Sequence, residues 1–182
     1  NSKIIVGGPH PTIFPEQTLE NNKDIDIAVV GEAEVTIVEL LDAIENKKSL
    51  SKIKGICYRD KGKVRLNQNR EFIQNIDETP LPARDLLDMK LYRPAPTYYK
   101  RLPSYVMLTS RGCPFRCVYC SKISGRIYRH HSVERVIKEM KILIEEYKTK
   151  EIVFRDDTFT ISKDFVKDLC NEIIKQGLNQ SC

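Results

Sequence analysis

Three cysteines in one short loop, with the spacing C-x3-C-x2-C, constrain this chain more than any other feature. They are Cys113, Cys117 and Cys120. Thiolates so close together in sequence can converge on a single metal centre, so the loop has to wrap around it. Iron–sulfur clusters are held by cysteine thiolates. On a [4Fe–4S] cluster, three thiolates would leave one iron open to a substrate or cofactor, which indicates chemistry at the cluster.

The residues around the cysteines favour a loop at the end of a buried strand. Pro114 stiffens the turn, and Gly112 can adopt backbone angles closed to other residues. The run from Tyr105 to Thr109 is apolar and β-prone, and a strongly periodic helix begins after Ser132. Ligand loops of α/β barrels lie at the carboxyl ends of parallel strands, so we expect such a barrel here.

A structural zinc site is the main alternative for this loop, and three unrelated thiols are another. Zinc usually takes four protein ligands, and no fourth cysteine or histidine stands at a usual spacing. His130 and His131 follow ten residues later in a basic stretch. The spacing therefore favours an iron–sulfur cluster over zinc.

With Tyr119 directly before the last cysteine, the loop resembles the radical S-adenosylmethionine superfamily. The resemblance implies that Cys113, Cys117 and Cys120 hold a [4Fe–4S] cluster. It also implies that S-adenosylmethionine chelates the open iron through its amino and carboxylate groups, close to Tyr119. Reductive cleavage of that cofactor would then start radical chemistry.

The same resemblance draws attention to Asp156 and Asp157, which follow the predicted strand Glu151–Phe154. In the superfamily, this strand end often meets the amino group of S-adenosylmethionine, which a carboxylate could bind. A solvated turn, or a salt bridge to Arg155, is the open alternative.

The N-terminal part resembles the back half of the cobalamin-binding domains that precede some radical S-adenosylmethionine barrels. The resemblance rests on the stretches 6–12 and 28–34. It implies that Gly7 and Gly8 let the backbone approach the nucleotide tail of cobalamin, and that Gly31 and Glu32 line the same crevice. The family's upstream Asp-x-His-x-x-Gly motif is missing, and His10 does not match it, so the cobalt ligand stays unassigned. A simple strand-end turn is the alternative.

Alternating strands and helices predict an α/β fold in several parts. We expect residues 1–50 to be the C-terminal part of a Rossmann-like cobalamin-binding domain, and 51–103 to be a hairpin and a Pro-rich linker. Residues 104–182 would form the first two βα units of a partial TIM-type radical S-adenosylmethionine barrel. Because most of the barrel would be missing and no initial Met is present, we expect a fragment that is inactive alone.

Composition narrows the class of protein. The chain has 182 residues, a formal net charge of +5 without a basic stripe, and neither an apolar run of membrane-spanning length nor a signal peptide. These features favour a cytoplasmic protein without a clear nucleic-acid or membrane partner. Cys57, Cys170 and Cys182 lack ligand spacing and are left out of the site.

The sequence therefore predicts a radical enzyme with a [4Fe–4S] cluster, S-adenosylmethionine and cobalamin as cofactors. Its chemistry would be methyl transfer, cyclisation or rearrangement on a small-molecule or lipid-like substrate, with flavodoxin or ferredoxin as electron donor. One alternative is a methylthiotransferase that acts on tRNA or protein. The other is a zinc-stabilised binding module without catalysis.

Overall fold

The computed structural model describes residues 2–121 and 123–181 and divides the chain into two compact units. The first consists of Asn1–Gln74 with Phe115–Gly125, and the second of Asn75–Pro114 with Arg126–Cys182. The unit boundary therefore runs through the cysteine loop. Cys113 belongs to the second unit, and Cys117 and Cys120 belong to the first.

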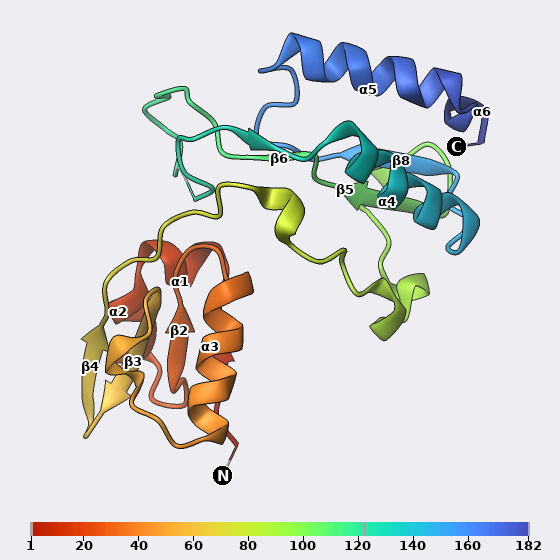
Figure 1. Ribbon diagram of the computed structural model, residues 1–182. Helices are drawn as coiled ribbons and strands as arrows, with labels where there is room; N and C mark the ends of the chain where they lie inside the picture. The colour runs from red at the N-terminus through yellow and green to blue at the C-terminus, as the bar shows by residue number, and fades with distance from the viewer. Residues whose placement is uncertain (1, 122, 182) are drawn as a thin grey trace. The chain divides into compact units, whose positions relative to one another are not determined.

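The first unit is built on a four-stranded sheet in the order β1-β2-β3-β4 (Figure 1). Strands β1 (Ile5–Val6) and β2 (Ile27–Val29) are parallel, whereas β3 (Ile56–Asp60) and β4 (Lys63–Leu66) form an antiparallel hairpin. The helices of this unit are α1 (Pro9–Ile13), α2 (Pro15–Asn21) and α3 (Glu34–Glu45), with a short 3-10 turn at Leu50–Lys52.

Strand β2 is buried on both faces because successive side chains of a strand point to opposite sides. Ile27 and Val29 pack in one core cluster with Leu40 of α3, and Ala28 packs in another with Leu19 of α2. The continuous apolar composition of β2 suits this burial on both faces.

One expectation for this unit needs correction. The hairpin is not part of a separate linker from residue 51, because β3 pairs with β2 from Ile27↔Tyr58 to Val29↔Ile56 and completes the first sheet. Helix α1 follows Gly8 directly, and Pro9 sits at its first position, where a missing N–H costs nothing.

The second unit carries the parallel pair β5 (Ser104–Met107) and β8 (Glu151–Phe154), in register from Ser104↔Glu151 to Met107↔Phe154. Each strand is followed by a capped helix. Ser132 caps α4 (Val133–Glu145) and Ser162 caps α5 (Lys163–Lys175), and each serine accepts a backbone N–H from the residue three positions on. Helix α6 (Leu178–Ser181) and a small antiparallel pair, β6 (Ser110–Arg111) with β7 (Arg129–His130), complete the unit.

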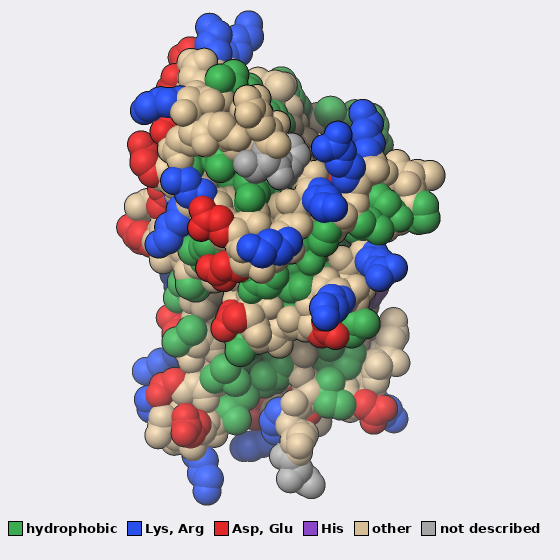
Figure 2. Space-filling model, turned by 90° about the vertical axis from the view of Figure 1, so that its right-hand side faces the viewer, with side chains coloured by type: hydrophobic (Ala, Val, Ile, Leu, Met, Phe, Trp, Pro, Cys, Tyr) green, Lys and Arg blue, Asp and Glu red, His purple; other side chains and the backbone are tan. Residues whose placement is uncertain are grey.

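The core of the second unit lies between this strand pair and its helices. Tyr105 and Met107 of β5 are buried against α4 and α5, whereas Val106 is 43% exposed and Leu108 is 50% exposed. Figure 2 shows hydrophobic side chains exposed between charged ones on one face of the molecule. Among the described residues β5 and β8 pair only with each other, so each strand keeps one unpaired edge.

The Pro-rich connector has only single 3-10 turns, as its prolines predicted. These turns are η2 (Ile76–Glu78), η3 (Arg84–Leu86), η4 (Met89–Leu91) and η5 (Pro96–Tyr98). Within the part of the chain that the structure describes, none of the helices has the length and apolar composition needed to cross a bilayer.

Candidate functional site

The first cysteine of the loop is held by the residues that follow β8. Gly112 is buried with φ +82°, and its N–H donates to Asp157 Oδ2 at 3.2 Å. The Sγ atom of Cys113 lies 3.5 Å from the Thr158 hydroxyl. The carboxyl end of one parallel strand thus supports the ligand loop that leaves its neighbour.

Asp156 also binds the chain that leaves β5, but it contacts residues before the cysteine loop. Its Oδ1 accepts hydrogen bonds from the N–H of Thr109 at 2.9 Å, the hydroxyl of Thr109 at 2.9 Å and the hydroxyl of Ser110 at 2.5 Å. Its Oδ2 is buried and has no hydrogen-bond partner among the described residues. The carboxylate is therefore turned toward the loop base, which favours a structural role over contact with a cofactor.

Tyr128 lies close to this carboxylate. Burial raises the pKa of Tyr128, and the negative charge of Asp156 raises it further. The Tyr128 side chain is therefore neutral at ordinary pH, and it adds no second negative charge to the base of the loop.

The other two cysteines lie on the exposed part of the loop. Cys117 and Cys120 are exposed, and the N–H of Cys120 donates to the Cys117 carbonyl at 3.2 Å. Tyr119 between them is 89% exposed. Among residues 2–121 and 123–181, no three His, Cys, Asp or Glu side chains are already gathered into a metal-binding group.

The far end of this loop is held within the first unit by Phe72. Gly125 has φ +79°, and a Cβ built on it would lie 2.5 Å from the Phe72 ring. A close approach of this kind requires glycine. Sequence reasoning missed this contact because Phe72 lies far from the loop in the chain.

The predicted cobalamin residues lie at the carboxyl ends of β1 and β2. Gly8 has φ +100° and Gly31 has φ +79°, and no atom lies within 4 Å of a Cβ built on either. Thr12 joins the two ends, since its hydroxyl donates to the Gly8 carbonyl at 2.8 Å and accepts the N–H of Gly31 at 3.1 Å. Because Gly8 and Gly31 have no side chain and face open space, a nucleotide-like group could approach their backbone closely.

Gly7 and Glu32, the other two residues predicted at this edge, do not face open space as Gly8 and Gly31 do. Gly7 has an ordinary neighbour, since its built Cβ would lie 3.9 Å from Val29. Glu32 accepts the N–H of Ile73 at 2.9 Å through Oε2, so its carboxylate anchors the start of the connector. Thr12 and Thr158 are the functional candidates that sequence reasoning missed, because a lone threonine carries no motif.

The histidines weighed as zinc ligands have structural partners instead. Nδ1 of His131 lies 2.8 Å from Asp77 Oδ1, and Nδ1 of His130 lies 2.8 Å from the backbone carbonyl of His131. The His130 ring also packs on Phe165, with ring centroids 4.5 Å apart. These contacts argue against a zinc site built from the loop and this pair.

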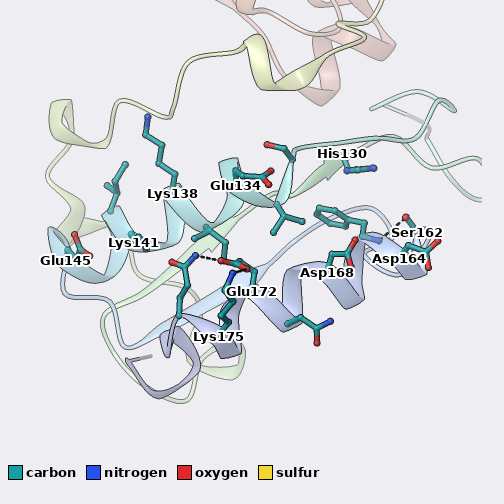
Figure 3. Close-up of a pocket in the computed structure, with 17 residues that line it drawn as sticks. His130, Glu134, Lys138, Lys141, Glu145, Ser162, Asp164, Asp168, Glu172 and Lys175 are labelled. Carbon is teal, nitrogen blue, oxygen red and sulfur yellow. Dashed lines mark hydrogen bonds and ion pairs between the residues drawn. The ribbon is translucent and has the colours of Figure 1, made fainter.

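A large groove of about 1140 Å³ runs between α4 and α5. Figure 3 shows its charged rim, where Glu172 accepts hydrogen bonds from Gln176 and Lys175. Neither the cysteine loop nor the strand-end residues 156–158 line it. The groove is the gap between neighbouring helices and is separate from the candidate site.

Comparison with known proteins matches both ends of the chain to described families. Residues 107–180 match the radical SAM superfamily, and residues 1–41 match the B12 binding domain. An uncharacterized methyltransferase of Pyrococcus horikoshii is 45% identical over 100% of this chain and 39% of its own length. An anaerobic magnesium-protoporphyrin IX monomethyl ester cyclase of Synechocystis is 28% identical over 98% of this chain and 35% of its own length.

Solved structures resemble this chain in fold. The cobalamin-dependent S-adenosylmethionine radical enzyme OxsB, with aqua-cobalamin and S-adenosylmethionine bound, has a TM-score of 0.74 at 25% identity over 96% of this chain and 24% of its own. The radical S-adenosylmethionine methyltransferase TsrM of Kitasatospora setae has a TM-score of 0.71 at 21% identity over 97% of this chain and 34% of its own. These likenesses confirm the predicted fold class. The chain spans little more than a third of the length of the curated relatives named above.

Proposed function

Because this chain belongs to the radical S-adenosylmethionine proteins that carry a B12 binding domain, we propose that the protein is a cobalamin-dependent radical enzyme that transfers a methyl group. The observation that carries the proposal is the C-x3-C-x2-C loop, placed at the carboxyl end of β5 and supported there by residues after β8. A barrel enzyme needs its ligand loop at this edge of the sheet.

Cys113, Cys117 and Cys120 would hold the cluster. The donor set fits, since it offers sulfur ligands in one loop whose start is fixed by Asp157 and Thr158, while Cys117 and Cys120 are exposed. When bound, a [4Fe–4S] cluster supplies the electron for reductive cleavage of S-adenosylmethionine, and cobalamin supplies a methyl carrier. The chain's own part is to hold these groups in line and exclude competing reactions.

Gly8 and Gly31, linked by Thr12, would form the cobalamin edge of the first unit. Open space around both glycines supports this assignment. Gly7 remains a candidate beside them, whereas Glu32 would act through the connector that it anchors. The cobalt ligand is not assigned to any residue of this chain.

Tyr119 and Asp157 are the candidates for contact with S-adenosylmethionine. Tyr119 is exposed beside the last cysteine, and Asp157 is exposed at the strand end. An exposed carboxylate can accept hydrogen bonds from a cationic amine as well as from Gly112. For Asp156 we propose a supporting role, because its Oδ1 already accepts three hydrogen bonds.

The name of the Pyrococcus relative, a methyltransferase 45% identical over the whole chain, favours methyl transfer. Ring closure is the second candidate, since the relatives also include cyclases of a magnesium porphyrin ester. We propose a small-molecule substrate, an electron donor of the flavodoxin or ferredoxin type, and a cytoplasmic location that keeps the thiols reduced. A methylthiotransferase acting on tRNA or protein remains the alternative within radical chemistry.

Anaerobic reconstitution with iron and sulfide tests the proposal. We expect the broad visible absorption of a thiolate-bound cluster, iron and sulfide in equal amounts, and release of 5′-deoxyadenosine from S-adenosylmethionine by the full-length protein under reducing conditions. The Cys117→Ala variant should lose all three, and the Cys170→Ala variant should keep them, because Cys170 lies on α5 outside the loop. Stoichiometric zinc without sulfide would instead support a binding module.

A further inference from the structure

We propose that Thr158 is a positioning residue for Cys113, and that its hydroxyl donates a hydrogen bond to the cysteine sulfur when the cluster is bound. This inference rests on the proposed function. It adds a residue that controls the reduction potential of the cluster from outside the ligand set. The Thr158 Oγ1 atom lies 3.5 Å from the Cys113 Sγ atom, which is within hydrogen-bond range for sulfur.

The contact is the last in a series that continues the pairing of β5 and β8. The N–H of Arg155 donates to the carbonyl of Met107 at 2.9 Å, directly after the last strand pair. Asp156 then holds Thr109 and Ser110, Asp157 holds Gly112, and Thr158 reaches Cys113. Four consecutive residues after β8 thus fix the chain from the end of β5 to its first cysteine.

The hydroxyl of Thr158 already has an acceptor, the Asp157 carbonyl, at 2.7 Å. A thiol can donate to the hydroxyl oxygen, so both contacts can coexist in the protein without a cluster. A cluster-bound thiolate has no proton, so only the hydroxyl can then be the donor. Rotation about one single bond turns its hydrogen from the carbonyl to the sulfur.

The reduction potential of an iron–sulfur centre depends on the hydrogen bonds that surrounding residues donate to its sulfur atoms. A donor next to the sulfur stabilises the more negative, reduced cluster more than the oxidised one. The Thr158 hydroxyl should therefore raise the potential, which eases reduction by the electron donor.

The Thr158→Val variant tests this role, because valine keeps the shape of threonine and removes the hydroxyl. Thr158→Ser keeps the hydroxyl, and Thr160→Val is a matched control at an exposed threonine of the same turn. The measurement is a redox titration of the reconstituted full-length protein, followed by electron paramagnetic resonance. The thermal midpoint of each variant without the cluster is measured alongside.

We expect a more negative potential in Thr158→Val, with no shift in Thr158→Ser or Thr160→Val and no change in thermal midpoint. A potential unchanged in Thr158→Val would overturn the inference while leaving the proposed function intact. If the unsubstituted protein bound no iron and sulfide, the proposed function itself would fail, and the inference would fail with it.

Discussion

Nδ1 of His131 lies 2.8 Å from Oδ1 of Asp77, and this contact fastens the connector to the start of α4. The N–H of Ser132 also donates to both oxygens of Asp77, each at 3.1 Å. A carboxylate at a helix N-terminus interacts favourably with the helix dipole as well. The carboxylate of Asp77 therefore holds the connector within the second unit, because it contacts both His131 and the N-terminus of α4.

The contact between His131 and Asp77 makes the second unit sensitive to acid. Burial lowers the pKa of His131 from 6.5, although Asp77 opposes the shift. Burial alone would raise the pKa of Asp77, but hydrogen bonds from Ser132 and His131 lower it below 3.8. In both groups the folded-state value is depressed, so their stability contributions are complete above the unfolded-state values and decline as pH falls through the folded-state values.

We therefore expect the free energy of unfolding to decline as pH falls below 6.5, and again below 3.8. Urea unfolding at about pH 7.5 and about pH 5.5, on either side of the ordinary histidine value, measures the first step. The His131→Gln variant should show a smaller difference between the two conditions, because glutamine does not titrate. Exposed His10 provides the control, since His10→Gln should leave the difference unchanged. An equal pH response in His131→Gln would contradict the assignment.

The ion pair between Arg84 and Glu139 is the second attachment of the connector. Arg84 Nη2 lies 2.5 Å from Glu139 Oε1, and the two side chains are only 12% and 8% exposed. Removal of one partner leaves a buried charge without compensation, so Glu139→Ala should cost about 3–5 kcal/mol of unfolding free energy. The exposed pair Lys175–Glu172 is the matched control, and Lys175→Ala should cost far less, because solvent screens this pair. Equal losses in urea unfolding would show that burial does not decide the outcome.

Alanine substitutions at the strand-end glycines can distinguish a loss of stability from a loss of cobalamin binding. Gly8, Gly31 and Gly62 all have positive φ and open space where a Cβ would stand. Alanine at any of them should cost roughly 1–3 kcal/mol, because a side chain rarely tolerates a positive φ. Only Gly8→Ala and Gly31→Ala should also weaken cobalamin binding, measured by spectrophotometric titration, because Gly62 lies in the β3–β4 turn. Equal cobalamin affinity in all three variants would exclude the strand ends as the binding edge.

The cysteines outside the loop should differ sharply in reactivity. Cys57 is fully buried in β3, and burial raises the pKa of its thiol to about 11. Cys170 is exposed on α5. Iodoacetamide at about pH 8 should therefore modify Cys170 in the native protein and reach Cys57 only after unfolding, because the thiolate is the nucleophile. Mass spectrometry of peptides reports both sites, and rapid native labelling of Cys57 would contradict its burial.

The helices and strands of this protein follow from local sequence. Helix α4 begins directly after Ser132, and β8 has the bounds Glu151–Phe154, both as predicted. The apolar period of each segment and the hydrogen-bonding side chain before it act over a few residues, so they can be read from neighbours in the chain. The cysteine motif is equally local, and it identified the family.

Contacts between segments that are far apart in the chain could not be predicted from local sequence. The hairpin gave no sign that β3 would pair with β2, because any exposed strand edge can accept an antiparallel partner. Nothing in the sequence indicated that Asp156 would accept hydrogen bonds from Thr109 and Ser110, or that Asp157 would accept one from Gly112. Which groups a carboxylate meets depends on the register of parallel strands that are more than 40 residues apart.

The sequence by itself determined the three cysteines proposed as cluster ligands, because thiolate chemistry and short spacing do not depend on the rest of the fold. Only the tertiary structure decided which residues support that set. Thr12 and Thr158 gain their places from contacts across strand ends, and a hydroxyl becomes specific only when folding brings an acceptor or a sulfur within reach. The physical reason is range, since covalent neighbours are fixed by the chain but hydrogen-bond partners are fixed by packing.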